Sequence, residues 1–200
     1  MLESIDYKWV LAGLGAIISM SNMGYYAFGI LKGRTKPHLY TWLIWSMVTF
    51  TVAAGLIFDG AGAGAIIPIL AGFNTLAIAI LAFSRGSKDI TKSDKLCLLG
   101  CFIALALWPL TKSPLWSIII VTMIDLVGYI PTIRKSYYTP HEESIYVFTI
   151  FLVTISLGLL ALHNYTLTTM FYFVVMNISN FAMVILLIIR RKKLGYKIWG

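Results

Sequence analysis

Four asparagines and one aspartate stand inside long apolar stretches of this sequence. They are Asn22, Asn74, Asp125, Asn177 and Asn180. A polar group at the depth of a bilayer is costly, so it faces the interior of a helix bundle, where it binds a neighbouring helix or a polar solute. We interpret the four asparagines as candidate substrate-binding residues. Hydrogen bonding between helices is the alternative role.

Asp125 is the only acidic residue within the seven apolar stretches. No lysine or arginine lies inside any of these stretches to pair with it. An ionised carboxylate at the centre of a bilayer costs about 3 kcal/mol on insertion scales. The carboxylate must therefore be protonated, hydrated or matched by a cationic solute. We predict that Asp125 is a proton-coupling residue, with hydrogen bonding of the protonated acid to a neighbouring helix as the alternative.

Two further residue types complete the candidate site. Trp42 and Trp45 are spaced to supply an apolar wall, and a binding pocket combines such a wall with a few polar groups. Pro68 and Pro131 lie inside or at the end of apolar stretches. Proline kinks a helix, so both are gating or hinge candidates, although prolines are also common in membrane helices generally.

Enzyme chemistry finds no support in the sequence, which contains no HExxH or GxSxG motif and no phosphate-binding loop with its lysine. His38 and His141 each follow a proline, which suggests a shared turn more than a metal site. Cys97 and Cys101 are interpreted as small buried hydrophobic residues. We therefore expect no catalytic activity, no metal and no cofactor.

The chain that carries these residues is unusually apolar. Of its 200 residues 59% are hydrophobic and 12% charged, and its mean hydropathy is +0.84. Soluble domains are about 45–50% apolar and about 25% charged. The composition excludes a soluble enzyme and, despite the net charge of +8, a nucleic-acid-binding module. A membrane span needs about 20 apolar residues. Seven stretches are candidates: 9–31, 39–58, 62–84, 96–111, 114–133, 144–163 and 166–189. The fourth is short for a full span and lies between Lys95 and Lys112.

The basic residues alternate with these stretches. Fourteen of the 16 lysines and arginines lie after the first, third, fifth and seventh stretches, while Lys8 and Lys112 lie on the other side. Short loops rich in lysine and arginine stay cytoplasmic. The pattern predicts a multi-pass protein of the plasma membrane or a bacterial inner membrane, with the N-terminus outside and the C-terminus cytoplasmic. The first residues, MLESIDYK, do not resemble a removable signal peptide.

An internal repeat is also visible. Gly24-Tyr25 returns as Gly128-Tyr129 after 104 residues, Pro37-His38 returns as Pro140-His141 after 103, and Asn74 and Asn180 each precede an arginine by eleven residues. The first of these matches places Ser21 at the position of Asp125. We predict two three-helix repeats, 1–84 and 114–191, joined by a segment with a linker helix, 85–113, and followed by a basic tail, 192–200. Parallel repeats are a transporter architecture with the substrate held near the middle of the bilayer.

Two triplets joined by one helix in about 200 residues resemble the SWEET/PQ-loop class of small-solute transporters. The Pro-Gln pair of that class is half kept here, because Pro131 is followed by Thr132, and Ala27 stands at the matching place in the first triplet. The resemblance implies a pocket-lining asparagine in the third helix of each triplet, which Asn74 and Asn180 match. Bacterial vitamin-precursor transporters share this architecture and use tryptophan-rich pockets, to which the pair Trp42 and Trp45 is similar.

The sequence therefore predicts an all-α integral membrane protein with seven transmembrane helices, arranged as two parallel three-helix bundles joined by a linker helix (3+1+3). We expect it to move a small polar solute by alternating access through a pocket between the repeats. Its expected partners are that solute and the lipid bilayer, and we expect no nucleic acid. Assembly into a homo-oligomer is compatible with this interpretation. A seven-helix receptor or a scaffold protein without transport activity is the alternative.

Overall fold

The described part of the chain is all-helical. A computed structural model describes residues 6–58, 60–107, 110 and 114–198. Within them lie seven α-helices and no strand, as the sequence predicts. The α-helices are α1 (Tyr7–Leu31), α2 (Leu39–Phe58), α3 (Ile66–Arg85), α4 (Lys92–Leu107), α5 (Pro114–Tyr138), α6 (Ile145–Leu160) and α7 (Leu167–Lys193). Two short 3-10 helices, η1 (Gly62–Ala65) and η3 (Pro140–Glu142), precede α3 and α6.

In the described part of the chain, four helical segments are both long and apolar enough to cross a membrane. These are α1, the part of α2 from Leu39 to Ile57, the segment from Gly62 to Arg85 that joins η1 to α3, and α7. α6 is apolar but shorter. The expected stretch 96–111 starts inside α4, but its residues 108, 109 and 111 lie outside the described residues, as does Lys112.

Helix ends are set by local capping residues. The side chain of Asp6 accepts a hydrogen bond from the amide of Lys8 at the start of α1, and Ser144 caps α6 in the same way. Thr166 and Thr169 form a reciprocal capping box at the start of α7. Such side chains satisfy amides that have no partner within the helix, so they fix where each helix begins.

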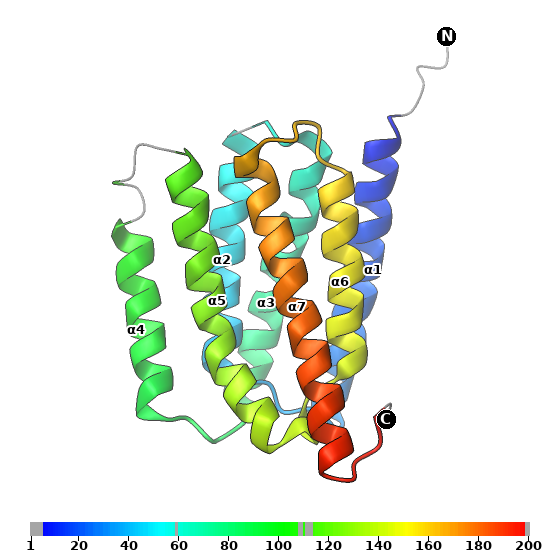
Figure 1. Cartoon of the computed structure of the whole chain (residues 1–200), viewed down its shortest axis with the longest axis vertical. Coiled ribbons are helices and arrows are strands. Elements are labelled where there is room, and N and C mark those ends of the chain that lie inside the picture. The colour runs from blue at the N-terminus through cyan, green and yellow to red at the C-terminus, as the bar shows by residue number, and fades with distance from the viewer. Residues whose placement is uncertain (1–5, 59, 108–109, 111–113, 199–200) are drawn as a thin grey trace.

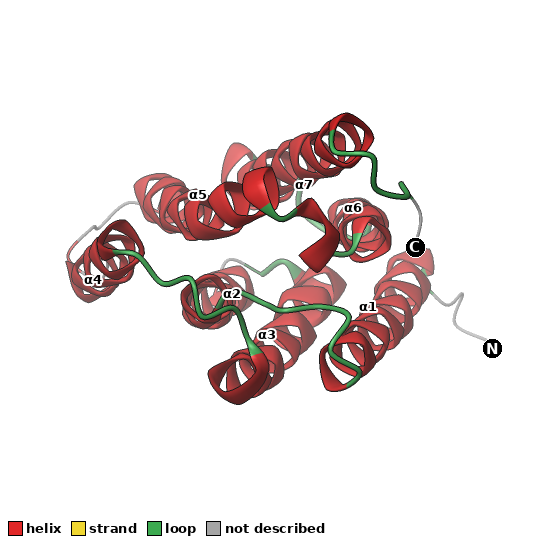
Figure 2. Cartoon of the chain, turned by 90° about the horizontal axis from the view of Figure 1, so that it is seen from below, coloured by secondary structure: helices red, strands yellow, loops and turns green. Residues whose placement is uncertain are grey.

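Six of the helices form a ring. α1 packs against α3 and α6, α2 packs against α3 and α5, and α7 packs against α5 and α6. α4 packs on α5 and α2 at the edge of the molecule (Figures 1 and 2). The centre of the ring is therefore surrounded by α1, α2, α3, α5, α6 and α7.

Two helices extend beyond the predicted stretches. α5 continues to Tyr138 and α7 continues to Lys193, although the apolar stretches end near 133 and 189. A helix that leaves a membrane can stay helical in water, because its backbone hydrogen bonds are internal. The extensions carry basic residues of both helices, and Arg134, Lys135 and Arg191 are buried or half-buried there. We call this end of the bundle, where α1, α3, α5 and α7 finish, the basic end.

Candidate solute-binding cavity

A cavity of about 90 Å³ lies within the ring of six helices. Every helix of the ring contributes to its wall, and none of the lining residues comes from α4. The lining residues of α3 and α7 belong to the first halves of those helices, whereas Trp45 and Phe151 belong to the first halves of α2 and α6, which begin at the basic end. The cavity therefore lies near the middle of the bundle. A space of this size holds a few water molecules or one small organic molecule.

One wall of the cavity carries a carboxylate among aromatic rings. Asp125 of α5 is 3% exposed, and the hydroxyl of Tyr172 approaches its carboxylate. The Trp45 indole donates a hydrogen bond to the backbone carbonyl of Asp125 (3.4 Å), and the Trp45 and Tyr129 rings lie 4.6 Å apart between centroids. The described lining residues include no lysine, arginine or histidine. The carboxylate therefore has no cationic partner in this wall.

The uncharged polar side chains of the wall are largely paired within the protein. The Asn180 oxygen accepts a hydrogen bond from the Tyr129 hydroxyl, and its amide nitrogen donates to the carbonyl of Met176, both at 2.8 Å. The hydroxyls of Thr75 and Thr154 donate to carbonyls of their own helices at 2.8 and 2.9 Å. The Asn180 amide keeps one N–H and one lone pair for a ligand, and the threonine oxygens keep their lone pairs as acceptors.

The lining residues come in pairs at constant spacing. Four residues of α3 each precede a lining residue of α7 by 105 positions, and residues of α1 and α2 precede lining residues of α5 and α6 by 106. The pairs are Ile67 and Tyr172, Pro68 and Phe173, Ala71 and Met176, Thr75 and Asn180, Ser19 and Asp125, Trp45 and Phe151, and Thr49 and Ile155. Equivalent positions of two segments thus build opposite parts of one wall.

The structure brings four of the predicted site residues to the cavity, namely Asn180, Trp45, Asp125 and Pro68. Pro68 lies in the first turn of α3, where a proline removes no helical hydrogen bond. It shapes the wall, and its position gives no reason for a kink. Pro131 is buried inside α5, which continues as one helix through it.

The other four predicted residues lie behind or beside the wall. Asn74 donates to the hydroxyl of Ser19 (3.3 Å), and Asn22 donates to the carbonyl of Val147 in α6 (3.1 Å). Asn177 accepts a hydrogen bond from Ser156 (3.1 Å), and the Trp42 ring packs 5.3 Å from Trp45. Asn74 and Asn180 therefore do not face each other, and Thr75 takes the position equivalent to Asn180. Successive residues of a helix point about 100° apart, so a shift of one residue moves the side chain off the wall.

The residue matches in α1 and α5 are also displaced from the structural ones. Ser21 and Tyr25 are exposed, whereas Asp125 and Tyr129 are buried, so the spacing of 104 pairs residues on different faces. Ser19, not Ser21, shares the cavity with Asp125. The match between His38 and His141 also joins residues in different environments, because His38 is buried and His141 is exposed.

Several lining residues escaped the sequence analysis, chiefly Tyr129, Tyr172, Phe173, Ser19 and Thr75. The paired positions differ in residue type, as Pro68 and Phe173 do, so matching identical residues could not find them. The signal that could have done so is the recurrence of buried faces at a spacing of 105 or 106.

A separate cluster of buried charges lies at the basic end. Glu143 accepts hydrogen bonds from the ammonium group of Lys135 and from the hydroxyl of Tyr26 (2.9 Å). Its backbone carbonyl accepts a hydrogen bond from the Arg191 guanidinium, which also donates to the carbonyl of Pro140 (3.1 Å). Glu143 and Lys135 are both 2% exposed. These contacts join α1, α5, α7 and the segment before α6.

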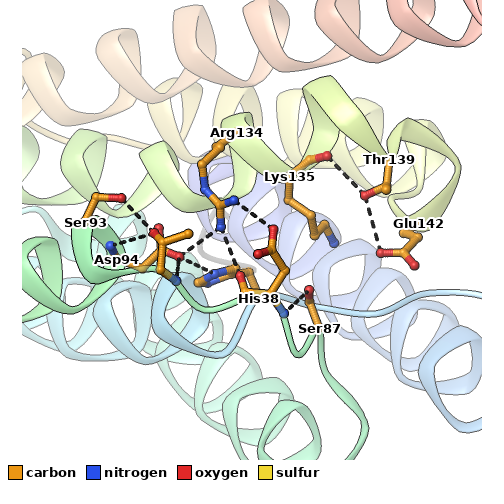
Figure 3. Close-up of polar contacts among 10 residues, drawn as sticks. His38, Ser87, Ser93, Asp94, Arg134, Lys135, Thr139 and Glu142 are labelled. Carbon is orange, nitrogen blue, oxygen red and sulfur yellow. Dashed lines mark hydrogen bonds and ion pairs between the residues drawn. The ribbon is translucent and has the colours of Figure 1, made fainter.

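Histidine and aspartate continue this cluster toward α4 (Figure 3). Asp94 accepts from the Arg134 guanidinium (2.9 Å) and contacts Nε2 of His38 at 3.2 Å, while Arg134 also pairs with Asp89 (2.8 Å). Burial lowers the pKa of His38, although the Asp94 charge opposes this. Burial of Asp94 acts to raise its pKa, but hydrogen bonds from Thr91 and the nearby charges of His38 and Arg134 outweigh this and lower it. The folded state therefore favours a neutral His38 beside an ionised Asp94.

Comparison with known proteins assigns neither a family nor a function to this chain. No family model matches the chain, and no curated protein or solved structure matches it significantly. The functional interpretation therefore depends on the cavity and on the arrangement of the helices around it.

Proposed function

We propose that the chain is a membrane transporter that moves a small polar solute by alternating access through the central cavity. The observation that carries this proposal is a cavity enclosed by six helices and lined at equivalent positions of two three-helix segments. Binding between two repeats, near the middle of the membrane, is how such transporters hold a substrate.

The 3+1+3 arrangement is part of the proposal, and burial supports it. Seven buried residues of α1 each have a buried counterpart in α5 at a spacing of 106. They run from Ala12, which corresponds to Ile118, to Ile30, which corresponds to Ser136. The same spacing of 106 relates lining residues of α2 and α6, so we infer a repeat in which α4 links the halves from outside.

Equivalent polar contacts give independent support. At the end of α3, Arg85 donates to the carbonyl of Leu31 (3.1 Å), and at the end of α7, Arg190 donates to the carbonyl of Tyr137 (2.7 Å). The two arginines are 105 residues apart and the two carbonyls 106 apart. The same contact thus occurs once in each proposed half.

We further propose that the basic end faces the cytoplasm and is closed in this structure. Fourteen basic residues on that side follow the positive-inside rule. The cavity lies near the middle of the bundle. At the basic end, Lys135 donates to the carbonyl of Lys36 and Tyr26 donates to Glu143, so these contacts join the two halves. Alternating access then requires the basic end to open while the other end closes.

The test is solute movement in proteoliposomes. A thermal-shift screen of sugars, amino acids, nucleosides and vitamin precursors first selects a ligand, and uptake of that ligand is then measured at several pH values. We expect uptake by the full chain and, with Asp125→Asn, normal insertion but loss of the pH dependence. Asp6→Asn is the matched control, because Asp6 lies outside the cavity and pairs with His163. A selected ligand that binds but never crosses the bilayer would favour a receptor or scaffold, and unchanged pH dependence in Asp125→Asn would make Asp125 structural.

A further inference from the structure

The central cavity combines aromatic and apolar surface with one carboxylate that has no positively charged partner in the described wall. Asp125 is buried, the described wall offers no positive side chain to it, and Trp45, Tyr129 and Tyr172 surround it. An ionised carboxylate in such a place gains most from a cation, and aromatic rings attract cations through their electron-rich faces. We infer that the cavity binds a small organic cation, an inference that rests on the proposed function and specifies its substrate class.

An organic cation fits this wall better than a metal ion. Calcium and magnesium require about six or more oxygen ligands in a compact shell. Here Asp125 supplies the one carboxylate of the described wall, and Phe151, Phe173 and Met176 present apolar surface. A cation that carries methyl or methylene groups would place its charge at Asp125 and its apolar body against these side chains.

A neutral sugar is a poorer match for the same reason. Its hydroxyls need several hydrogen-bond donors and acceptors at once, and Phe151, Phe173 and Met176 supply none from their side chains. Leaving solute hydroxyls unpaired in a buried site is costly. The charge of Asp125 and the aromatic walls are therefore the features that select the ligand.

Binding of choline and of its neutral carbon analogue, 3,3-dimethylbutan-1-ol, tests this inference directly. The two molecules have nearly the same shape and differ in the positive charge. Calorimetric titration of the purified full chain should show that choline binds at least about tenfold more tightly than the alcohol. A tenfold ratio corresponds to a difference of about 1.4 kcal/mol in binding free energy. Tetramethylammonium serves as a smaller cationic probe.

Variants assign the preference to individual residues. Asp125→Asn should bring the ratio of the two affinities close to one, whereas Asp125→Glu and the control Asp6→Asn should keep it. Tyr172→Leu should weaken choline binding by roughly 2- to 30-fold, the range for a cation–π contact, with little change for the alcohol. Asp125→Glu and Tyr172→Leu keep the inference testable if Asp125→Asn does not fold.

The outcomes separate this inference from the transport proposal. Equal binding of choline and the alcohol, no binding of either cationic probe, or an unchanged preference in Asp125→Asn would overturn the inference. Vesicle uptake of a neutral solute without any preference for cations would leave transport standing and overturn the cation site. Cation binding that depends on Asp125 but gives no uptake would support the site and contradict transport.

Discussion

At the basic end of the bundle, charged side chains that are almost fully buried join several elements, whereas at the opposite end the polar contacts are partly exposed. Glu143 and Lys135 have about 2% of their surface exposed. At the other end, the side chains of His163 and Asp6 pair at 2.7 Å but are 31% and 39% exposed, and Lys8 donates to the carbonyl of Leu162.

This difference indicates which end opens at lower cost. Exposed ion pairs are worth little, because water replaces the partner that each group loses. Separating a buried pair is costly unless water reaches both charges at the same time. The basic end should therefore open only in a concerted way that hydrates its charges, while the opposite end can open by small local movements.

Glu143→Gln is the change with the largest expected effect. The amide leaves the buried Lys135 ammonium without its counter-charge, which should lower the free energy of unfolding by about 3–5 kcal/mol. Glu142→Gln is the control, because Glu142 pairs with Lys36, whose side chain is 52% exposed. That neighbouring change should cost at most about 1 kcal/mol. Denaturant unfolding of the two variants in detergent measures both, and similar losses would remove the distinction between buried and exposed pairs at this end.

Gly62→Ala should perturb the opposite end by an intermediate amount. Gly62 has a φ of +58°, and an added Cβ would lie 2.7 Å from Nδ1 of His163. Gly60 has a φ of +68° and nothing within 4 Å of such an atom. The left-handed conformation costs roughly 1–2 kcal/mol in each case, and only Gly62→Ala must also displace His163 from Asp6.

Thermal unfolding of the two alanine variants gives the comparison. Gly62→Ala should unfold at a lower temperature than Gly60→Ala. Equal midpoints would mean that the contact between Gly62 and His163 contributes nothing to holding this end together.

Acid should weaken the basic end by a smaller amount through His38. Because burial lowers the pKa of His38 below its unfolded value of about 6.5, the folded state favours the neutral ring. The resulting stability is present above pH 6.5 and is lost as pH falls below it, with a slope of at most about 1.4 kcal/mol per pH unit for one proton. The lowered pKa of Asp94 acts in the same direction, below pH 3.9 or so.

A pH series of unfolding midpoints between 7.5 and 5.5 measures this effect. His38→Gln should remove most of the decline, because an amide can still bind Asp94 but does not titrate. Arg134 and Lys135 are the other charged groups near His38. A decline of the same size in His38→Gln would assign the acid sensitivity to other groups.

The sequence alone predicted the helices well and the cavity only in part. Long apolar runs bounded by charges predicted seven helices, and the stretch 39–58 coincides with α2. Asp125 and Asn180 were found because polar residues inside apolar stretches point inward, and Trp45 because a tryptophan pair can form the apolar wall of a pocket.

The remaining part of the cavity depends on register, which residue identity did not reveal. Asn74 resembles Asn180 in type, yet it lies one position from Thr75, which lines the wall. Tyr129 and Tyr172 look like ordinary membrane aromatics until the ring of helices places them beside Asp125. The basic-end cluster was not predicted either, because Glu143 and Arg191 are far apart in the sequence and meet only when α7 packs beside α5 and α6.

Arg191 also has a consequence for how two chain segments are held at the end of α7. Its guanidinium binds carbonyls of Pro140, Glu143, Lys197 and Ile198. One side chain therefore fastens the segment before α6 and the segment after α7 to the same helix end. Its removal, as in Arg191→Ala, would release both segments at once.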